Sequence, residues 1–117
     1  MKMVVAIIRP EKLEAVQQAL NERDVYLMTV TDVRGCGRQR GYTEVYRGTE
    51  FQVRLLPKLK LEIAVNDAFV EATIEAIVHA ARTPETGQIG DGKIFVLPLE
   101  DCVRIRTGER GGQAIGP

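Results

Sequence analysis

Strict alternation of apolar and other residues between Lys58 and Val65 constrains this fold more than any other feature of the chain. Successive side chains of a β-strand point to opposite faces of a sheet. An alternating run therefore predicts a strand with one face in the core and one face left to solvent or to another subunit. The core face consists of Leu59, Leu61, Ile63 and Val65, and the opposite face of Lys58, Lys60, Glu62 and Ala64.

The rest of the chain predicts further strands and two helices. Met3–Ile8 is an apolar run rich in β-branched residues, which is typical of a strand buried on both faces. Pro10 suits the first turn of a helix, and Asn66 or Asp67 can cap a second helix. The apolar helix positions are Leu13, Val16, Ala19 and Leu20 in the first helix and Val70, Ile74, Ile77, Val78 and Ala81 in the second. The other strands are expected at Met28–Val33 and Ile94–Leu97, with a short fifth strand at Val103–Arg106 and a mobile tail at Gly108–Pro117.

The order β-α-β-β-α-β predicts an α+β fold, the ferredoxin-like sandwich, in which helices cover one face of an antiparallel sheet. At 117 residues we expect a single domain, 1–117, with one core. The bare sheet face favours oligomerisation. No run reaches the ~18 apolar residues of a membrane span, and the apolar N-terminus lacks a signal-peptide cleavage site. We therefore expect a cytoplasmic protein.

Positive charge gathers in the middle of a chain that is neutral overall, with 16 Lys+Arg against 16 Asp+Glu. Neutrality argues against a general attraction to nucleic acid or to a membrane. Between Arg34 and Lys60, however, basic residues far outnumber acidic ones. The segment from Gly37 to Leu55 shows no clear period, and a loop of that length inside a compact domain is normally functional or disordered.

Two glycine-rich segments and one arginine pair predict an anion site. Gly87–Lys93 nearly spells the P-loop pattern, but Ile94 replaces the Ser/Thr that would hold magnesium and a strand follows instead of a helix. Its glycines still let backbone N–H groups converge on an anion. Gly35–Gly41 is a second glycine-basic loop, and Arg104 and Arg106 would project from one face of the short last strand. Together these elements favour a polyphosphate site.

Catalysis has little support in the sequence. The single histidine, His79, falls inside the second helix, where we expect a structural or exposed role. Cys36 and Cys102 lack metal-ligand spacing and are expected as free thiols, although a disulfide between them is possible. No nucleophile with an adjacent base suggests itself, so we expect a binding protein and not an enzyme.

Six segments point to one family when they are read together. They are Ile7–Leu13, Met28–Thr31, Gly35–Gly41, Thr43–Gly48, Gly90–Val96 and Arg104–Glu109. In this order and spacing they resemble the PII signal-transduction proteins, the nitrogen-status regulators that include the GlnK-type partners of ammonium transporters. The resemblance covers nearly the whole chain, and its last two segments are the most specific. It implies a homotrimer that binds ATP or ADP in the clefts between subunits.

The resemblance also implies which residues bind which ligand. Magnesium would bridge the ATP phosphates, and Gln39 would help to present it to 2-oxoglutarate, whose far carboxylate would pair with Lys58. The residues implied for 2-oxoglutarate are Gln39, Arg40, Gly41 and Lys58. The residues implied for the nucleotide are Thr29, Glu62 and Ala64 at the adenine, with Gly35, Gly37, Arg38, Gly90, Asp91, Gly92, Lys93, Arg104 and Arg106 nearer the phosphates.

Three loops of the family correspond to segments of this chain. The T-loop is at about 37–55, the B-loop at about 82–93 and the C-terminal loop at about 103–117. The resemblance implies that the T-loop is flexible and contacts a target protein through Tyr46, Arg47 and Gly48. The expected target is an ammonium transporter or a regulator or enzyme of nitrogen metabolism. Contact with a membrane would then come only through a transporter, and no nucleic-acid partner is expected.

This chain departs from the family pattern at three places. Phe51 stands where many relatives carry a tyrosine modified by nucleotidylation. Since phenylalanine has no hydroxyl, we predict that a cognate transferase leaves this position unlabelled. The B-loop carries extra residues around 84–86, and Gln88 stands where relatives commonly have lysine. A lost base near the phosphates should weaken ATP binding and shift preference towards ADP or AMP. Cys36 takes a position often held by a bulky residue.

Two other classes of function fit the fold less well. A nucleic-acid-binding module would need aromatic residues on the sheet for base stacking. Tyr42, Tyr46 and Phe51 fall in the predicted T-loop, and the sheet offers only Phe95. An enzyme of this fold would need a base or a water-positioning pair, and the sequence supplies neither. A nucleotide-sensing regulator is therefore the leading expectation.

Overall fold

The computed structural model describes residues 1–36, 45–46, 49–50 and 55–116. The strands in this part of the chain are β1 (Lys2–Ile8), β2 (Thr29–Gly35), β3 (Val45–Tyr46), β4 (Thr49–Glu50), β5 (Leu56–Val65) and β6 (Gly92–Pro98). The α-helices are α1 (Leu13–Asn21), α2 (Val70–Ala81) and α3 (Gly112–Ile115). Two short 3-10 helices, η1 (Pro10–Lys12) and η2 (Asp67–Phe69), lead into α1 and α2.

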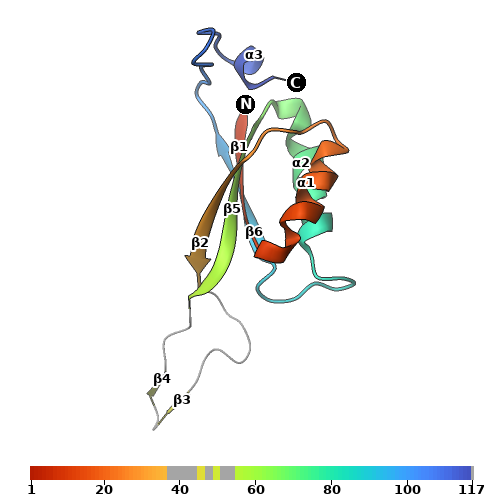
Figure 1. The fold of residues 1–117 in the computed structure, drawn as a ribbon, viewed down its shortest axis with the longest axis vertical. Helices are drawn as coiled ribbons and strands as arrows, with labels where there is room; N and C mark the ends of the chain where they lie inside the picture. Colours follow the sequence, from red (N-terminus) through yellow and green to blue (C-terminus); the bar gives the residue numbers. More distant parts are fainter. Residues whose placement is uncertain (37–44, 47–48, 51–54, 117) are drawn as a thin grey trace.

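Four strands form one antiparallel sheet in the order β2-β5-β1-β6, and α1 and α2 lie together on one of its faces (Figure 1). The two inner strands are β5 and β1, and Val4 of β1 lies opposite Ile63 of β5 and Val96 of β6. This arrangement confirms the predicted α+β, ferredoxin-like fold. The four predicted long strands are all present, with ends shifted by no more than two residues.

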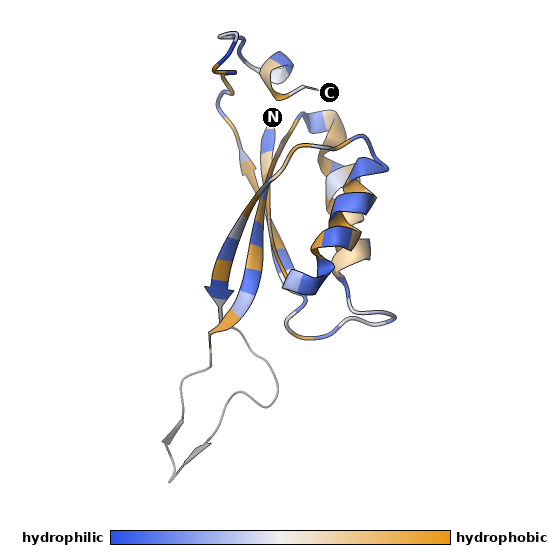
Figure 2. Ribbon diagram, viewed as in Figure 1, coloured by the Kyte–Doolittle hydropathy of each residue, from blue (hydrophilic) through white to orange (hydrophobic). Residues whose placement is uncertain are grey.

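The core lies between the sheet and the two helices. The alternation in β5 is confirmed, because its four predicted core residues are all buried. Hydrophilic residues colour much of α1, whereas most of α2 carries apolar colours, and apolar and hydrophilic residues alternate along the strands (Figure 2). The expectation that β1 is buried on both faces is wrong for the single chain. Its buried residues are Val4, Ala6 and Ile8, whereas Met3, Val5 and Ile7 on the face without helices are only partly buried.

Helix α2 is rotated slightly from the predicted orientation. It buries Thr73 and Ala76 together with the predicted Ile77 and Ala81, whereas Val78 is exposed. Thr73 is tolerated in the core because its hydroxyl donates to the carbonyl oxygen of Phe69 at 2.7 Å, so no polar group is left without a partner. A threonine is therefore accommodated in the core because the backbone of its own helix supplies the hydrogen-bond partner of the hydroxyl.

The predicted cap of the second helix has another task. Asn66 precedes η2 but makes no side-chain capping hydrogen bond. Its Nδ2 instead donates to the carbonyl oxygens of Gly112 and Gly116, at 3.1 and 2.9 Å. A residue type that usually caps a helix thus connects the start of η2 to the end of the chain.

Two predictions for the C-terminal segment (99–116) are wrong. Val103 forms only an isolated bridge with Arg110, and 105–107 is a turn, so the predicted fifth strand is absent. The predicted mobile tail is folded, because Gly112–Ile115 forms α3 and Ile115 is buried. Alternation over only four residues is too short to predict a strand. A turn takes its place, in which the N–H of Gly108 donates to the carbonyl oxygen of Arg104.

The predicted T-loop leaves the sheet between β2 and β5. Within it β3 pairs with β4, with Val45 opposite Glu50 and Tyr46 opposite Thr49. The sequence pattern did not predict this short ladder. No helix in the described part of the chain combines the length and the apolar character needed to span a membrane.

Candidate functional site

The B-loop is organised around one carboxylate. Asp91 accepts hydrogen bonds from the backbone N–H and the hydroxyl of Thr83, at 2.8 and 2.6 Å, and from the backbone N–H of Gln88 at 2.9 Å. Arg9, at the end of β1, donates its Nε to the same carboxylate at 3.1 Å and its Nη2 to the carbonyl oxygen of Ile89 at 3.0 Å. Both ends of the loop are therefore fixed to one side chain.

These bonds decide the protonation of Asp91. Burial alone would raise the pKa of this carboxyl, but the hydrogen bonds from Thr83, Gln88 and Arg9 outweigh burial and hold the pKa well below its ordinary value. Asp91 is thus ionised at neutral pH. All of its contacts in the structure are internal, which favours a role in shaping the loop. Its predicted role as a nucleotide ligand stays a prediction.

Position 92, where the B-loop enters β6, must be glycine because the backbone of β1 lies too close for a side chain. Its φ is +116°, and a Cβ added there would lie 1.7 Å from the carbonyl oxygen of Ile7. Any side chain would have to displace the backbone of β1, one of the two inner strands of the sheet. The glycine that the sequence assigned to phosphate binding is thus also a structural necessity.

Lys58 lies beside the B-loop as a buried cation. It is 9% exposed, and its Nζ donates to the carbonyl oxygen of Gly90 at 2.7 Å. No described carboxylate forms an ion pair with it. Burial, and next the nearby charge of Arg9, lower the pKa of Lys58. The charges of Glu11 and Asp91 act in the opposite direction, but Asp91 is already committed to the loop and neither carboxylate forms an ion pair with Lys58. Lys58 is therefore a buried cation whose described hydrogen-bond partner is a neutral carbonyl, which suits contact with an anion.

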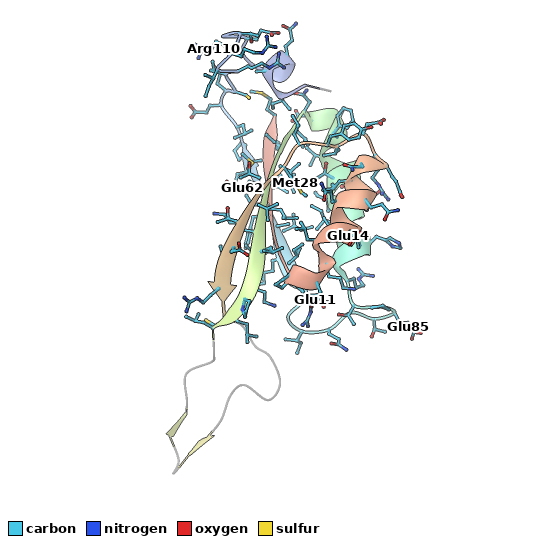
Figure 3. The ribbon with its side chains drawn as sticks, viewed as in Figure 1. Glu11, Glu14, Met28, Glu62, Glu85 and Arg110 are labelled. Atoms are coloured by element: carbon cyan, nitrogen blue, oxygen red, sulfur yellow. The ribbon has the colours of Figure 1, made fainter. Side chains whose placement is uncertain are left out.

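The predicted adenine residues lie together on the sheet face without helices. Residues directly opposite in antiparallel strands share a face. Thr29 of β2 pairs with Glu62 of β5, and Ala64 follows on the same face. Figure 3 shows Glu62 near the middle of the sheet, on the side away from α1 and α2. The structure therefore brings these three residues together as one patch.

The two predicted arginines do not form the pair that the sequence suggested. Because 105–107 is a turn, Arg104 and Arg106 do not project from one strand face. Arg104 is partly buried, and its Nη1 donates to Glu109 at 2.8 Å. Arg106 is exposed. The prediction of two parallel arginines is wrong because the strand it required does not form.

Within one chain the predicted phosphate residues fall into two groups. Gly35, Gly90, Gly92 and Lys93 lie at the end of the sheet that carries the B-loop. Arg104 and Arg106 follow β6 at the opposite end, where the N- and C-termini also lie (Figure 1). The strand between them spans about 20 Å at the usual rise per residue. One chain therefore does not bring these groups to a common point.

Several predicted site residues lie outside the described part of the chain. They are Gly37, Arg38, Gln39, Arg40, Gly41, Arg47 and Gly48, together with the unmodified position Phe51. Tyr46 belongs to β3. In the described ranges no three His, Cys, Asp or Glu side chains cluster as metal ligands. Both cysteines are free, as predicted, and His79 is exposed.

A groove of about 650 Å³ lies on the helix-covered side of the B-loop. Ile74 and Ile77 of α2 and Ile94 of β6 contribute apolar lining, and Arg82 and Lys93 contribute basic side chains. Thr29, Glu62 and Ala64 do not line it. This groove is thus separate from the patch predicted to hold adenine.

A sequence model of one family, described as nitrogen regulatory protein P-II, matches residues 1–109. The chain belongs to this family. The P-II protein of Rhodospirillum rubrum is 56% identical over 115 residues, which cover 98% of this chain and 100% of the relative. The P-II 2 protein of Methanothermobacter thermautotrophicus is also 56% identical, and GlnK1 of Methanosarcina mazei is 54% identical, each over 98% of this chain and 97% of the relative.

Membership of the P-II family confirms the resemblance read from the sequence. P-II proteins are signal-transduction regulators and not enzymes, so this chain is a regulator. Sequence reasoning missed two residues of the B-loop end, Arg9 and Thr83. The signal for Arg9 was its position directly after β1, where a side chain reaches the adjoining β5 and β6 ends. Thr83 carried no signal before the loop was seen to close on Asp91.

Proposed function

We propose that this P-II protein is a homotrimeric cytoplasmic sensor that binds ATP or ADP and 2-oxoglutarate, with Mg²⁺, and controls a target through its T-loop. The target would be an ammonium transporter or an enzyme or regulator of nitrogen metabolism. The observation that supports this function best is the separation of the predicted phosphate residues into two groups, at opposite ends of one sheet. Each group is half of a phosphate site, so the site would be completed between two copies of the chain.

The direction of the sheet suggests how the two halves combine. One copy would contribute the B-loop end, with Gly90, Gly92 and Lys93, and the start of the T-loop at Gly35. The neighbouring copy would contribute Arg104 and Arg106. The adenine would rest on the patch formed by Thr29, Glu62 and Ala64, which lies on the same open face. This division explains why phosphate-binding residue types occur at both ends of a short sheet.

The open face supports assembly of several copies. Phe95 and Leu97 of β6 are 51% and 47% exposed on this face, next to the partly buried Val5 and Met3 of β1. Exposed apolar residues that are contiguous usually mark an interface. Burying them against other copies would also explain why β1 is apolar on both sides.

The charges at the B-loop end support an anionic effector. A 2-oxoglutarate carboxylate that reached Lys58 would replace a neutral carbonyl partner by a charged one. Charge-assisted hydrogen bonds are roughly twice as strong as neutral ones. Arg9 would remain fixed by Asp91, so Lys58 is the cation with more to gain. Gln39, Arg40 and Gly41 would complete this site.

A subunit-mixing experiment tests the shared nucleotide site. Lys93→Ala and Arg104→Ala each remove one half, and each variant alone should bind ATP at least about tenfold more weakly. Trimers that contain both variants restore one unaltered interface, so they should regain tight binding at a fraction of their sites. Calorimetry on purified mixed trimers measures this, and the double variant Lys93→Ala/Arg104→Ala mixed with wild-type chains is the matched control.

Two outcomes would contradict the shared site or the proposed function. If mixed trimers bind no better than the single variants, the two halves do not meet between chains. Titrations with ADP, AMP and 2-oxoglutarate, with and without Mg²⁺, would then show which ligands the protein senses. A chain that ignores all adenine nucleotides would overturn the proposed function.

A further inference from the structure

The guanidinium of Arg104 is held by the end of the chain. Its Nη1 donates to Oε1 of Glu109 at 2.8 Å, and its Nη2 donates to the carbonyl oxygens of Gln113 and Ala114 at 3.0 and 3.4 Å. A guanidinium has five N–H donors in a fixed planar arrangement. Fixing some of them therefore orients the others, including Nε.

The carbonyls that hold Arg104 belong to α3, whose position depends on Asn66. Nδ2 of Asn66 donates to Gly112 at the start of α3 and to Gly116 just after it. The fit is tight, because a Cβ at Gly112 would lie 2.8 Å from Oδ1 of Asn66. Ile115 is 9% exposed and anchors the same helix. An isolated four-residue helix would not be stable in water, so these contacts determine where α3 lies.

A continuous chain of contacts thus runs from Asn66 through α3 to Arg104. Arg106, two residues further on, has no comparable support: it is exposed, and no hydrogen bond from its guanidinium is found within the described residues. Only one of the two arginines is therefore preorganised. Preorganised donors bind an anion better because they lose less conformational freedom on binding.

We propose that Asn66 is a positioning residue for nucleotide binding, because it docks α3 and α3 orients the guanidinium of Arg104 towards the phosphates. This inference rests on the proposed function, in which Arg104 contacts the nucleotide. It adds a residue that does not touch the ligand, and it assigns a role to the helix at 112–115, which follows the last residue of the family match at 109.

The test is a double-mutant cycle on the full-length chain. Asn66→Ala changes no charge, so a loss of affinity cannot arise from altered electrostatics. We expect it to weaken ATP binding about fivefold to tenfold in calorimetry. In the Arg104→Ala background the same substitution should change ATP affinity by less than about twofold, since the group through which it acts is gone. A general structural defect would weaken binding in both backgrounds.

A second variant reaches α3 from the opposite side. Gly112→Val places a side chain against Asn66 and should undock the helix with the same loss of affinity and the same dependence on Arg104. Asp67→Asn is the matched control: it neutralises the adjacent carboxylate that pairs with the N-terminal ammonium, a contact that does not involve α3. This control should bind ATP like the unaltered chain.

The outcomes separate this inference from the proposed function. If unaltered protein binds ATP but Asn66→Ala and Gly112→Val bind equally well, or lose affinity equally with and without Arg104, the positioning role is wrong and the sensor function stands. If unaltered protein does not bind ATP, both are overturned. Loss of affinity that depends on Arg104, in either variant, supports the positioning role.

Discussion

The glycine-rich segments at the two ends of the sheet are held in place by different contacts. The B-loop and the C-terminal segment are both rich in glycine, and both place basic residues next to an anion site in the proposed function. In the B-loop, Asp91 collects donors from within the loop and from Arg9. The C-terminal segment is held through mostly exposed contacts, from Asn66 outside it and from Asp101 and Glu109 within it.

The comparison shows that glycine content does not determine order. The B-loop is fixed by an ionised carboxylate with several partners, and such charge-assisted bonds are strong. The C-terminal segment also contains such a carboxylate, because Asp101 accepts from Arg110 and from the backbone N–H groups of Cys102 and Gly111, but these contacts are exposed. Its docking to the rest of the chain depends on the neutral amide of Asn66 and on the buried Ile115. We therefore expect the B-loop to unfold with the whole domain and the C-terminal segment to open locally at lower cost.

Gly92→Ala should have the largest effect. The added Cβ would meet the backbone of Ile7, so the sheet must shift, and we expect a loss of at least about 4 kcal/mol in the free energy of unfolding. Gly108→Ala is the matched control at the other end. It has a similar left-handed φ of +74° but nothing within 4 Å of the added atom, so about 1 kcal/mol is expected. Chemical denaturation measures both, and equal losses would contradict the difference between the two ends.

Asp91→Asn should destabilise the protein by about 3 kcal/mol at pH 7, because an amide cannot accept all the bonds that the carboxylate accepts. The folded pKa of Asp91 lies below its unfolded pKa, so its stabilisation is complete above the ordinary aspartate pKa of ~4. It is lost as the pH falls towards the folded pKa. Denaturation at several pH values should show the difference between variant and parent constant from pH 7 to about 5 and shrinking below pH ~4. A difference independent of pH would contradict the ionised role.

Ile115→Ala should act on the C-terminal segment alone. Loss of its buried side chain weakens docking by up to about 2 kcal/mol, but local opening limits the effect on global stability. Hydrogen exchange at the amides of Gly108, Gly111 and Gly116 should accelerate at least about tenfold, because each is bonded only within this segment. The amides of β1 should be unchanged. If they also exchange faster, the segment is not an independent unit.

Asp67→Asn should have the smallest effect on stability. The carboxylate is exposed and pairs with the N-terminal ammonium at 2.8 Å, and exposed ion pairs contribute little. Thermal unfolding should show no clear shift, and the shift should be smaller still in high salt. A clear loss would mean that the ends of the chain are held by charge and not by Asn66.

The sequence predicted the sheet better than it predicted the site. Two-residue alternation in β5 and the apolar run of β1 are local patterns, and local patterns predict strands reliably when they are long. The four residues from Val103 to Arg106 alternate equally well, but they are too few and have no neighbouring strand to pair with. The same limit explains the error over the tail, whose order depends on Asn66, about forty-six positions away.

The sequence alone determined the fold class, the family and the residue types suited to phosphate, because these depend on periodicity and on short motifs of adjacent residues. The tertiary structure decided which of those residues meet. It placed Lys93 and Arg104 at opposite ends of one sheet, it gave Asp91 a structural task within the B-loop, and it gave Asn66 a docking contact in place of the expected capping role. The physical reason is that a hydrogen bond or an ion pair depends on distance in space, and only the packed strands and helices set that distance.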